Sequence, residues 1–473
     1  MTLTSFDYLI FLPFVFLVYW GCCGRSAKWQ NAFLLLANLV FYACWDWRFL
    51  SLLLVTAAST FLVGKLMDRE ENCRRRFFLS LTALVLNIGV LACFKYFNFF
   101  VQSFADLFAL FGITLQLPTL KILLPVGISF YTFAALSYTL DVYMRKIKAT
   151  DDWLAYFSYV TFFPSILSGP IGRATVQLPQ FFRKRVFGYD WAVRACRTIL
   201  YGAFMKLCVA DRLGLYVDAV YGNISQHNGT SLFLASVFYT LQIYADFAGY
   251  SLMAIGSGKL FGIDLQTNFV RPYFSKTVTE FWRRWHISLT TWFRDYIYFP
   301  LGGSRVSKKR WMLNIMVVFT VSGIWHGAAY TFVLWGMLHG ACMVVERLLY
   351  GSRIKDISNR LTALNLVRIF FTFNIVSLAW ILFRLPSLSE VGMVVSKIFT
   401  EPGMTFLDND TMLLAAMSLV IMLAKDIADE WLPTMRLMNN SRMVVRFVSC
   451  LFLLCYILLF GVLNGGSFIY FQF

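Results

Sequence analysis

The sequence predicts an all-α protein that crosses a membrane many times. Hydrophobic residues make up 59% of the 473 residues and charged residues only 14%, whereas a soluble domain typically carries about 25% charged residues. The hydrophobic residues gather in long runs, and the Lys and Arg residues lie in short segments between them. The formal net charge of +17 is therefore typical of loops that flank a bilayer, and we expect no nucleic-acid binding.

Apolar runs of about 17 to 25 residues are long enough to cross a bilayer, and we expect about 11 or 12 transmembrane helices. The candidates lie near residues 7–23, 30–46, 48–65, 77–98, 122–143, 195–217, 231–256, 311–329, 330–349, 365–384, 411–425 and 445–463. The first run lacks the basic start and the small-residue cleavage pattern of a signal peptide, so we expect it to be retained.

The basic loops predict the orientation. Basic residues cluster at 25–28, 69–76 and 145–148, after the first, third and fifth spans, while the intervening loops carry almost none. Because basic loops stay on the cytoplasmic side, the N-terminus should be extracytoplasmic. The same pattern needs both ends of the apolar segment 153–171 on one side, so this segment, which contains Pro164, is interpreted as a re-entrant helix.

The segment 271–310 is too charged to span, yet it is rich in aromatic residues. Large apolar residues recur at helical spacing and predict an interfacial amphipathic helix that carries His286; they are Phe281, Trp285, Leu289, Trp292 and Tyr296. We treat the chain as a single domain over residues 1–473, with N-terminal helices in 1–121, a core in 122–350 and C-terminal helices in 351–473.

His326 lies in the apolar run Ser322–Gly340, where an imidazole is costly unless it is paired or lines a polar cavity. Three interpretations remain open: a catalytic base, a metal ligand together with His286 and His339, or a hydrogen-bonded structural histidine. The metal site is disfavoured, because positions 326 and 339 would lie about 220° apart on a continuous helix and no zinc motif is present. No GxSxG elbow occurs, which favours a histidine that deprotonates a substrate hydroxyl.

Asp246 is a second charge inside an apolar run, and it needs a cation or a polar route. It is interpreted either as a structural partner of an arginine between Arg283 and Arg294 or as a group that orients a histidine. His227, in a polar loop, is interpreted as solvated.

Two long motifs resemble those of the membrane-bound O-acyltransferase family, and within it the bacterial branch that O-acetylates alginate and related polysaccharides. They are EFWRRWHISLTTWFRDYIYFPLGGSR, at Glu280–Arg305, and SGIWHGAAYTFVLWGMLHG, at Ser322–Gly340. Four further segments match: Leu124–Arg145, Phe162–Arg173, the segment LQIYADFAGYSLMAIG around Asp246, and Phe468–Phe473.

The resemblance implies a helical fold around a central tunnel in the bacterial inner membrane. It implies that His326 is the catalytic residue, that His286 is a second histidine required for activity, and that His339 is structural. Supporting or donor-binding roles are expected for Trp325, Arg283, Arg284, Arg294, Asp295 and Asp246. No metal and no bound cofactor are expected.

The resemblance further implies that an acyl thioester, such as acetyl-coenzyme A, is the donor and that an extracytoplasmic polysaccharide is the acceptor. A secreted or periplasmic SGNH-type acyltransferase is the expected partner. A D-alanyl transferase of the teichoic-acid type that uses an acylated carrier protein is one alternative. A transporter is an alternative of another class, although no inverted repeat is evident.

Overall fold

The computed structural model describes residues 1–115, 117, 123–351, 360–406, 409–432, 437–463, 465–466 and 468–471. Within these residues the secondary structure is helical and contains no strand, which confirms the all-α class. Residue 122 of the expected span 122–143 and the last two residues of the motif Phe468–Phe473 lie outside the described residues.

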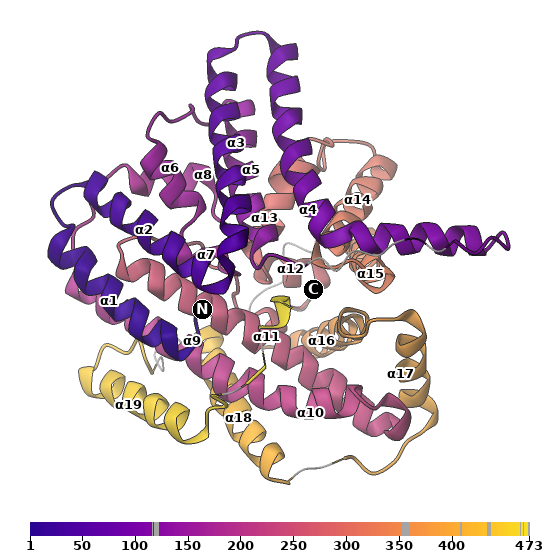
Figure 1. Cartoon of the computed structure of the whole chain (residues 1–473). Helices are drawn as coiled ribbons and strands as arrows, with labels where there is room; N and C mark the ends of the chain where they lie inside the picture. Colours follow the sequence, from indigo (N-terminus) through magenta and orange to yellow (C-terminus); the bar gives the residue numbers. More distant parts are fainter. Residues whose placement is uncertain are drawn as a thin grey trace. The chain divides into compact units, whose positions relative to one another are not determined.

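The chain forms two compact units. Unit 1 comprises Met1–Cys196 with Ala254–Gln266, and unit 2 comprises Arg197–Met253 with Thr267–Phe473. The expected division into residues 1–121, 122–350 and 351–473 stays a prediction. Unit 1 contains the first eight helices (Figure 1): α1 (Phe6–Cys22), α2 (Ala27–Asp46), α3 (Leu50–Arg69), α4 (Cys73–Ala109), α5 (Ile128–Tyr143), α6 (Trp153–Val160), α7 (Phe163–Ile166) and α8 (Ala174–Gln177).

Helix α9 (Tyr189–Phe204) continues from unit 1 into unit 2, and α11 (Gly229–Leu260) continues from unit 2 into unit 1. Unit 2 contains the remaining helices: α10 (Asp211–Tyr221), α12 (Val278–Arg284), α13 (Ile287–Phe293), α14 (Lys308–His326), α15 (Tyr330–Tyr350), α16 (Ala363–Arg384), α17 (Leu388–Thr400), α18 (Asn409–Trp431) and α19 (Met443–Phe460). Two π-helical turns, Met205–Ala210 and Arg294–Tyr298, follow α9 and α13.

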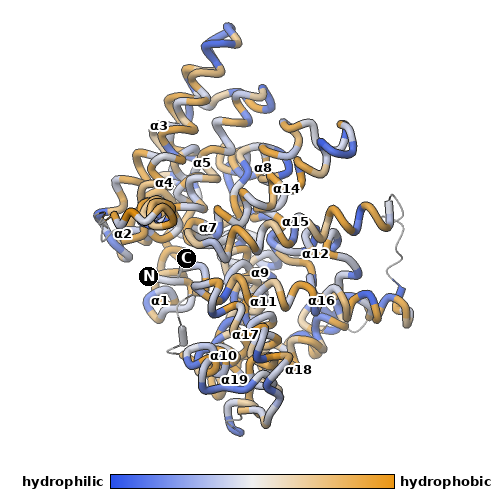
Figure 2. Tube along the Cα trace, turned by 90° about the vertical axis from the view of Figure 1, so that its right-hand side faces the viewer, coloured by the Kyte–Doolittle hydropathy of each residue, from blue (hydrophilic) through white to orange (hydrophobic). Residues whose placement is uncertain are grey.

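Seven helical segments among the described residues are long and apolar enough to cross a membrane. The segment Ala27–Arg69 joins α2 and α3 and covers two expected spans; α4, α11, α15, α16, α18 and α19 each cover one more. Hydrophobic residues run along most helices, while hydrophilic residues gather near the turns, as at the end of α3 (Figure 2). The chain is therefore a multi-pass membrane protein.

The other four expected spans form helices that differ from a simple span. Helices α1 and α5 have 17 and 16 residues, and α14 begins with three basic residues. The expected span 195–217 is interrupted by the π-helical turn Met205–Ala210. Composition alone identified these apolar runs, but it could not identify where the helices break.

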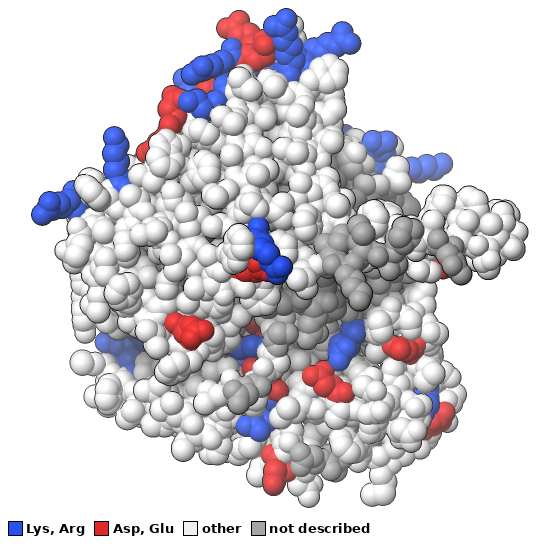
Figure 3. Space-filling model, viewed as in Figure 1, with Lys and Arg blue, Asp and Glu red and all other residues white. Residues whose placement is uncertain are grey.

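Two of the basic loops lie at the same end of unit 1. The guanidinium of Arg76, at the start of α4, donates to the carbonyls of Val142 and Tyr143 at the end of α5, at 2.9 and 3.1 Å, and to the carbonyl of Met67 in α3. Lys and Arg side chains gather over the turn between α3 and α4 (Figure 3). The loops after the expected third and fifth spans are thus on one side, whereas the direction of the N-terminus stays a prediction.

The segment 153–171 is broken and buried within unit 1. Helix α6 ends at Val160, and the short helix α7 carries Pro164 in its first turn. Gly127 packs against this segment with φ +77°, and a Cβ there would overlap the backbone carbonyl of Ile166. Non-helical backbone at membrane depth is tolerated when protein surrounds it, which suits a re-entrant segment; the side of the membrane on which its ends lie stays a prediction.

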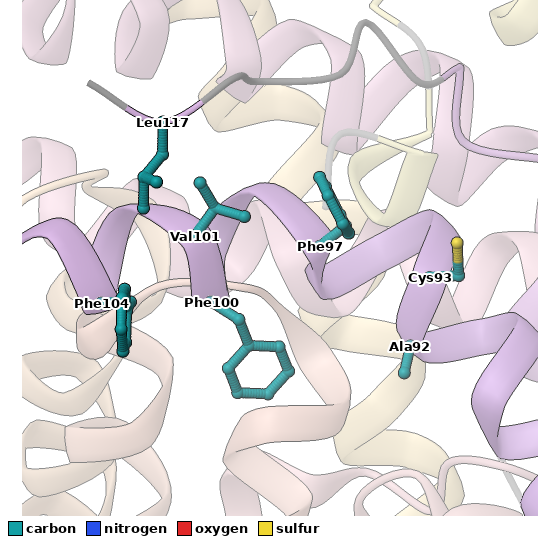
Figure 4. A pocket seen from close by; sticks show the side chains of 7 residues that line it. All are labelled: Ala92, Cys93, Phe97, Phe100, Val101, Phe104 and Leu117. Atoms are coloured by element: carbon teal, nitrogen blue, oxygen red, sulfur yellow. The ribbon is translucent and has the colours of Figure 1, made fainter. Parts of the chain in front are cut away.

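An apolar cavity of about 600 Å³ lies along the second half of α4 in unit 1. Figure 4 shows its lining side chains, which are Ala92, Cys93, Phe97, Phe100, Val101, Phe104 and Leu117. Apart from one thiol, these side chains are hydrocarbon and aromatic. The lining of this cavity contains no His, Asp, Glu or Lys side chain.

In unit 2, α14 and α15 form a hairpin whose backbones touch. A Cβ on Gly323 would overlap the carbonyl oxygen of Phe332, and a Cβ on Gly336 would overlap that of Phe319. Small residues at such positions let membrane helices approach closely. Gly323 and Gly336 therefore have a packing role, and the hairpin fixes the end of α14, where His326 lies.

We predict that Gly336→Ala destabilises the protein, because the added methyl group meets backbone atoms that cannot move aside; overpacking typically costs about 1 to 3 kcal/mol. The matched control is Gly392→Ala in α17, where nothing lies within 4 Å of an added Cβ and alanine favours the helix. Thermal unfolding of both variants in detergent measures the difference. Equal midpoints would contradict the tight α14–α15 contact.

Candidate active site

His286 lies where the expected amphipathic helix breaks. Helix α12 ends at Arg284 and α13 begins at Ile287, and His286 between them has φ 41° and ψ 54°. The expectation of one continuous helix through positions 281–296 is therefore wrong. A left-handed conformation is strained for a residue with a side chain, and such strain tends to occur at functional sites.

Asn268 holds this break in place. Its backbone carbonyl accepts from the Ile287 N–H at 2.9 Å, and its side-chain oxygen accepts from the Ser288 hydroxyl at 2.6 Å and from the Ser288 N–H at 3.3 Å. Its side-chain amide donates to Ser251 on α11 at 3.1 Å. Asn268 is buried, so these bonds are made away from water. They position the first turn of α13, and with it His286.

Two carboxylates from later helices fix α12. Glu346 on α15 accepts from the backbone N–H groups of Val278 and Thr279 at the start of α12. Glu430 on α18 accepts from Arg284 at 2.9 Å and from Arg271 at 2.6 Å. Arg284 also pairs with Glu280 at 2.7 Å. The predicted donor-binding residue Arg284 is therefore held in an ion-pair network inside unit 2.

His326 is the last residue of α14, and its ring orientation is defined by one short hydrogen bond. Its Nδ1 lies 2.6 Å from the carbonyl oxygen of Ser322, one turn earlier. Because a carbonyl oxygen can only accept, Nδ1 must carry the proton. In a neutral imidazole, Nε2 is then the nitrogen with the lone pair, which is the atom that a general base uses. Ser322 contributes its backbone carbonyl, not its hydroxyl, to this bond.

The two histidines share aromatic neighbours although they lie 40 residues apart. The ring of Trp325 is 6.2 Å from the ring of His286 and 4.9 Å from that of His326. The ring of Tyr470 is 6.4 Å from that of His286 and 5.9 Å from that of His326. Phe247 packs edge-on against His286 at 4.7 Å. His286 is 0% exposed and His326 is 3% exposed.

Burial controls the charge of His286. It lowers the pKa of this imidazole well below the usual value of 6.5, and the proximity of His326 lowers it further. His286 is therefore neutral near pH 7, and the pair holds at most one extra proton. A neutral imidazole can accept a proton at one ring nitrogen and donate a hydrogen bond from the other. This suits acid-base chemistry.

Asp246 pairs with a lysine, and not with an arginine as the first interpretation expected. The Nζ atom of Lys206 lies 2.8 Å from Oδ1 of Asp246 and 2.6 Å from Oδ1 of Asp211. All three side chains are buried. Sequence reasoning missed Lys206, although a lysine inside the expected span 195–217 was itself a signal of a buried ion pair.

A small polar cavity of about 60 Å³ adjoins this ion-pair network in unit 2. It is lined by Lys206, Asp211, Gly214, Leu215, Asp218, Tyr239, Gln242, Asp246, Arg384, Gly466 and Ile469. Two lining residues, Asp246 and Ile469, are followed directly in the chain by Phe247 and Tyr470, which pack against the histidines. The cavity therefore lies close to the histidine cluster, by which we mean His286, His326 and the rings of Phe247, Trp325 and Tyr470 that pack against them.

The other predicted residues have different surroundings. Arg283 is exposed, and Arg294 is exposed, pairs with Asp295 at 2.8 Å and lies over the ring of Phe299. The fourth histidine, His227, lies in the loop between α10 and α11, 5.1 Å from the ring of Phe406. Arg283 and Arg294 are thus exposed cations, of which Arg294 already has a carboxylate partner.

His339 is buried among large rings of unit 2. Its Nδ1 accepts from the indole N–H of Trp282 at 3.3 Å, and the ring of Trp335 lies 5.1 Å away. This surrounding suits the structural role that was expected. Among the described residues, no group of three His, Cys, Asp or Glu side chains gathers as metal ligands do, and the expectation of a site without metal stays a prediction.

Two buried histidines, His286 and His326, share aromatic neighbours in a multi-pass helical protein, an arrangement that suits an enzyme site. The model of the membrane-bound O-acyltransferase family matches residues 148–388, a range that includes Asp246, His286 and His326. The chain belongs to this family and is an acyltransferase. This confirms the resemblance seen in the two long motifs.

The curated relatives cover most of the chain. It is 34% identical to the probable alginate O-acetylase AlgI of Azotobacter vinelandii over 88% of this chain and 81% of the relative. It is 31% identical to the probable alginate O-acetylase AlgI of Pseudomonas putida over 98% of each. It is also 31% identical to the peptidoglycan O-acetyltransferase of Helicobacter pylori, over 81% of this chain and 77% of the relative.

We predict that Asn268→Ala lowers both stability and activity, because it removes the side-chain hydrogen bonds that hold Ser251 and Ser288 to the break at His286. The expected cost is about 2 to 4 kcal/mol, at roughly 1 kcal/mol for each buried bond. Asn374→Ala, whose amide donates back to its own helix at Phe370, serves as the control. Thermal unfolding and turnover measure the effect, and an Asn268→Ala variant that matches the control in both would contradict this role.

Proposed function

We propose that the protein is an O-acetyltransferase that takes an acetyl group from a cytoplasmic thioester and delivers it for O-acetylation of an extracytoplasmic polysaccharide such as alginate. The observation that carries this proposal is the buried His326, whose Nδ1 is committed to the Ser322 carbonyl so that Nε2 is the basic atom. The relatives named as alginate O-acetylase and peptidoglycan O-acetyltransferase support acetyl as the acyl group and a glycan as the acceptor.

In the proposed reaction, Nε2 of His326 takes the proton of the acceptor hydroxyl as its oxygen attacks the thioester carbonyl carbon. The carbon–sulfur bond then breaks, and the proton passes from His326 to the leaving thiolate, so that an oxygen ester and a free thiol result. General-base catalysis of this kind contributes about 10² to 10⁴ in rate. The neutral His286 would donate a hydrogen bond to the carbonyl oxygen as negative charge develops there.

Acetyl-coenzyme A is the proposed donor, a substrate and not a resident cofactor. Its phosphates are anionic, and the exposed Arg283 and Arg294 can attract them. Arg284 belongs to the ion pairs with Glu280 and Glu430 and serves the fold. Asp295, which pairs with Arg294, would set the orientation of that arginine. Trp325 would hold the two imidazoles at a fixed separation.

The proposed location is the bacterial inner membrane, with the N-terminus extracytoplasmic. The donor is cytoplasmic and the glycan lies outside, so the reaction needs a passage between helices that connects both sides. Enclosure by aromatic rings would keep bulk water from hydrolysing the thioester. A secreted or periplasmic SGNH-type acyltransferase is the proposed partner that receives the acetyl group before the glycan does.

We predict that His326→Ala lowers consumption of labelled acetyl-coenzyme A by about 100-fold or more, because the general base is lost. His286→Ala should lower it too, whereas His227→Ala, in the loop between α10 and α11, should leave it unchanged. The assay uses purified protein, and ester-linked acetate on exported glycans gives a second measurement. Normal turnover by correctly folded His326→Ala would refute the proposed mechanism.

The same assay separates the alternative donor. A D-alanyl transferase of the teichoic-acid type would consume D-alanyl carrier protein and leave acetyl-coenzyme A intact. The transporter considered from the sequence is set aside, because the chain belongs to an acyltransferase family. If the protein consumed only the carrier-protein thioester, the transferred group would be D-alanine and the proposed acetyl donor would be refuted.

We predict that Arg283→Gln raises the KM for acetyl-coenzyme A by a few fold. Added salt should reduce the difference in KM between this variant and the wild type, because salt screens exposed charges. The matched control is the same substitution at the neighbouring residue, Arg284→Gln. It should lower thermal stability, because Glu430 and Glu280 lose a largely enclosed cationic partner. If Arg284→Gln instead changed KM with normal stability and Arg283→Gln changed nothing, the donor would contact Arg284.

A further inference from the structure

Helices α9 and α11 touch through two glycines in unit 2, and this contact brings a lysine and an aspartate together. A Cβ on Gly202 would overlap the carbonyl oxygen of Gly249, and a Cβ on Gly249 would press on the backbone N–H of Lys206. Lys206 lies in the π-helical turn that follows α9. Such turns are rare and occur frequently at functional sites.

The buried Lys206 and Asp246 each hold a second group besides one another. The Nζ of Lys206 donates to the carbonyl of Gly466 at 3.2 Å. Oδ2 of Asp246 accepts from the backbone N–H of Ile469 at 2.8 Å. Residues 465–466 and 468–470, which we call the closing segment, are thus held at two backbone positions by one ion pair.

The closing segment includes Tyr470, whose ring belongs to the histidine cluster. Tyr470 lies next to Ile469 in the chain and contacts the rings of both His286 and His326. Phe468 stacks on Tyr470 with ring centroids 5.6 Å apart. The position of Tyr470 therefore depends on where the ion pair holds the backbone of Ile469.

We propose that Asp246 is a positioning residue, which with Lys206 holds the closing segment so that Tyr470 fixes the two histidine rings for catalysis. Buried ion pairs are costly, and replacing them with apolar side chains often leaves stability unchanged or raises it. Stability alone is thus a weak reason for this pair, whereas a fixed backbone position beside the reacting imidazoles is a specific one. The inference rests on the proposed function of His326.

Asp246→Ala is the variant of choice, because Lys206 keeps Asp211 as a partner at 2.6 Å and no buried charge is left alone. Asp246→Asn keeps an oxygen that can accept from Ile469. The matched control is Asp218→Asn, which removes an acid on the same cavity whose exposed carboxylate pairs with Arg384 at 2.8 Å. All variants are made in the full chain in detergent or nanodiscs.

The first measurement is hydrogen exchange at the amide of Ile469. Asp246→Ala should speed it by about 10- to 100-fold, as expected for loss of a charge-assisted hydrogen bond. Asp246→Asn should lie between Asp246→Ala and wild type, and Asp218→Asn should match wild type. Unchanged exchange in correctly folded Asp246→Ala would overturn the inference.

The second measurement is turnover with labelled acetyl-coenzyme A. Asp246→Ala should lower kcat by about 10-fold or more with KM within about twofold of wild type, because misplaced reacting groups slow the chemical step. Tyr470→Leu should lower kcat similarly while leaving exchange at Ile469 slow. Faster exchange with unchanged kcat would overturn the positioning role.

The two measurements separate this inference from the proposed function. Wild-type protein that does not consume acetyl-coenzyme A would contradict the proposed donor, and the exchange rate at Ile469 would still decide whether Asp246 holds the closing segment. A drop in kcat in Asp246→Ala together with normal kcat in His326→Ala would refute the assignment of the base but would keep the link between the closing segment and catalysis.

Discussion

The hydrogen bond from Nδ1 of His326 to the Ser322 carbonyl is the interaction on which the proposed chemistry of this site depends. It sets the tautomer, so that the basic lone pair is on Nε2. The bond exists because α14 is helical up to its last residue, which brings a carbonyl one turn earlier within reach of the ring. Helix α14 in turn keeps its place because Gly323 and Gly336 allow α15 to approach it.

The second histidine depends on a different constraint. A left-handed backbone at His286 turns the chain between α12 and α13, and Asn268 compensates the strain with hydrogen bonds to both residues that follow. A regular helix would carry His286 in a different direction. The rings of Phe247, Trp325 and Tyr470 pack around the ring of His286 in this position.

The sequence was sufficient for the features that follow from composition and from the cost of burying charge. Long apolar runs predicted a multi-pass helical protein, and an imidazole in such a run pointed to His326. Aromatic spacing located the segment around His286 but predicted a continuous helix. The break carries no Gly or Pro, and a positive φ at a histidine leaves no sequence signal. The partner of Asp246 was missed for another reason, because Lys206 lies 40 residues away and was read as part of a span.

The claim that His326 and His286 form one catalytic centre is tested most directly by a structure with a non-hydrolysable acetyl-coenzyme A analogue bound to the full-length protein in nanodiscs. We predict that the carbonyl carbon of the analogue lies about 4 to 6 Å from Nε2 of His326, so that an acceptor oxygen between them is within hydrogen-bond reach of Nε2 and about 3 to 3.5 Å from the carbon, with the carbonyl oxygen directed toward His286. An analogue bound away from both rings, with the aromatic cluster closed around them, would contradict it.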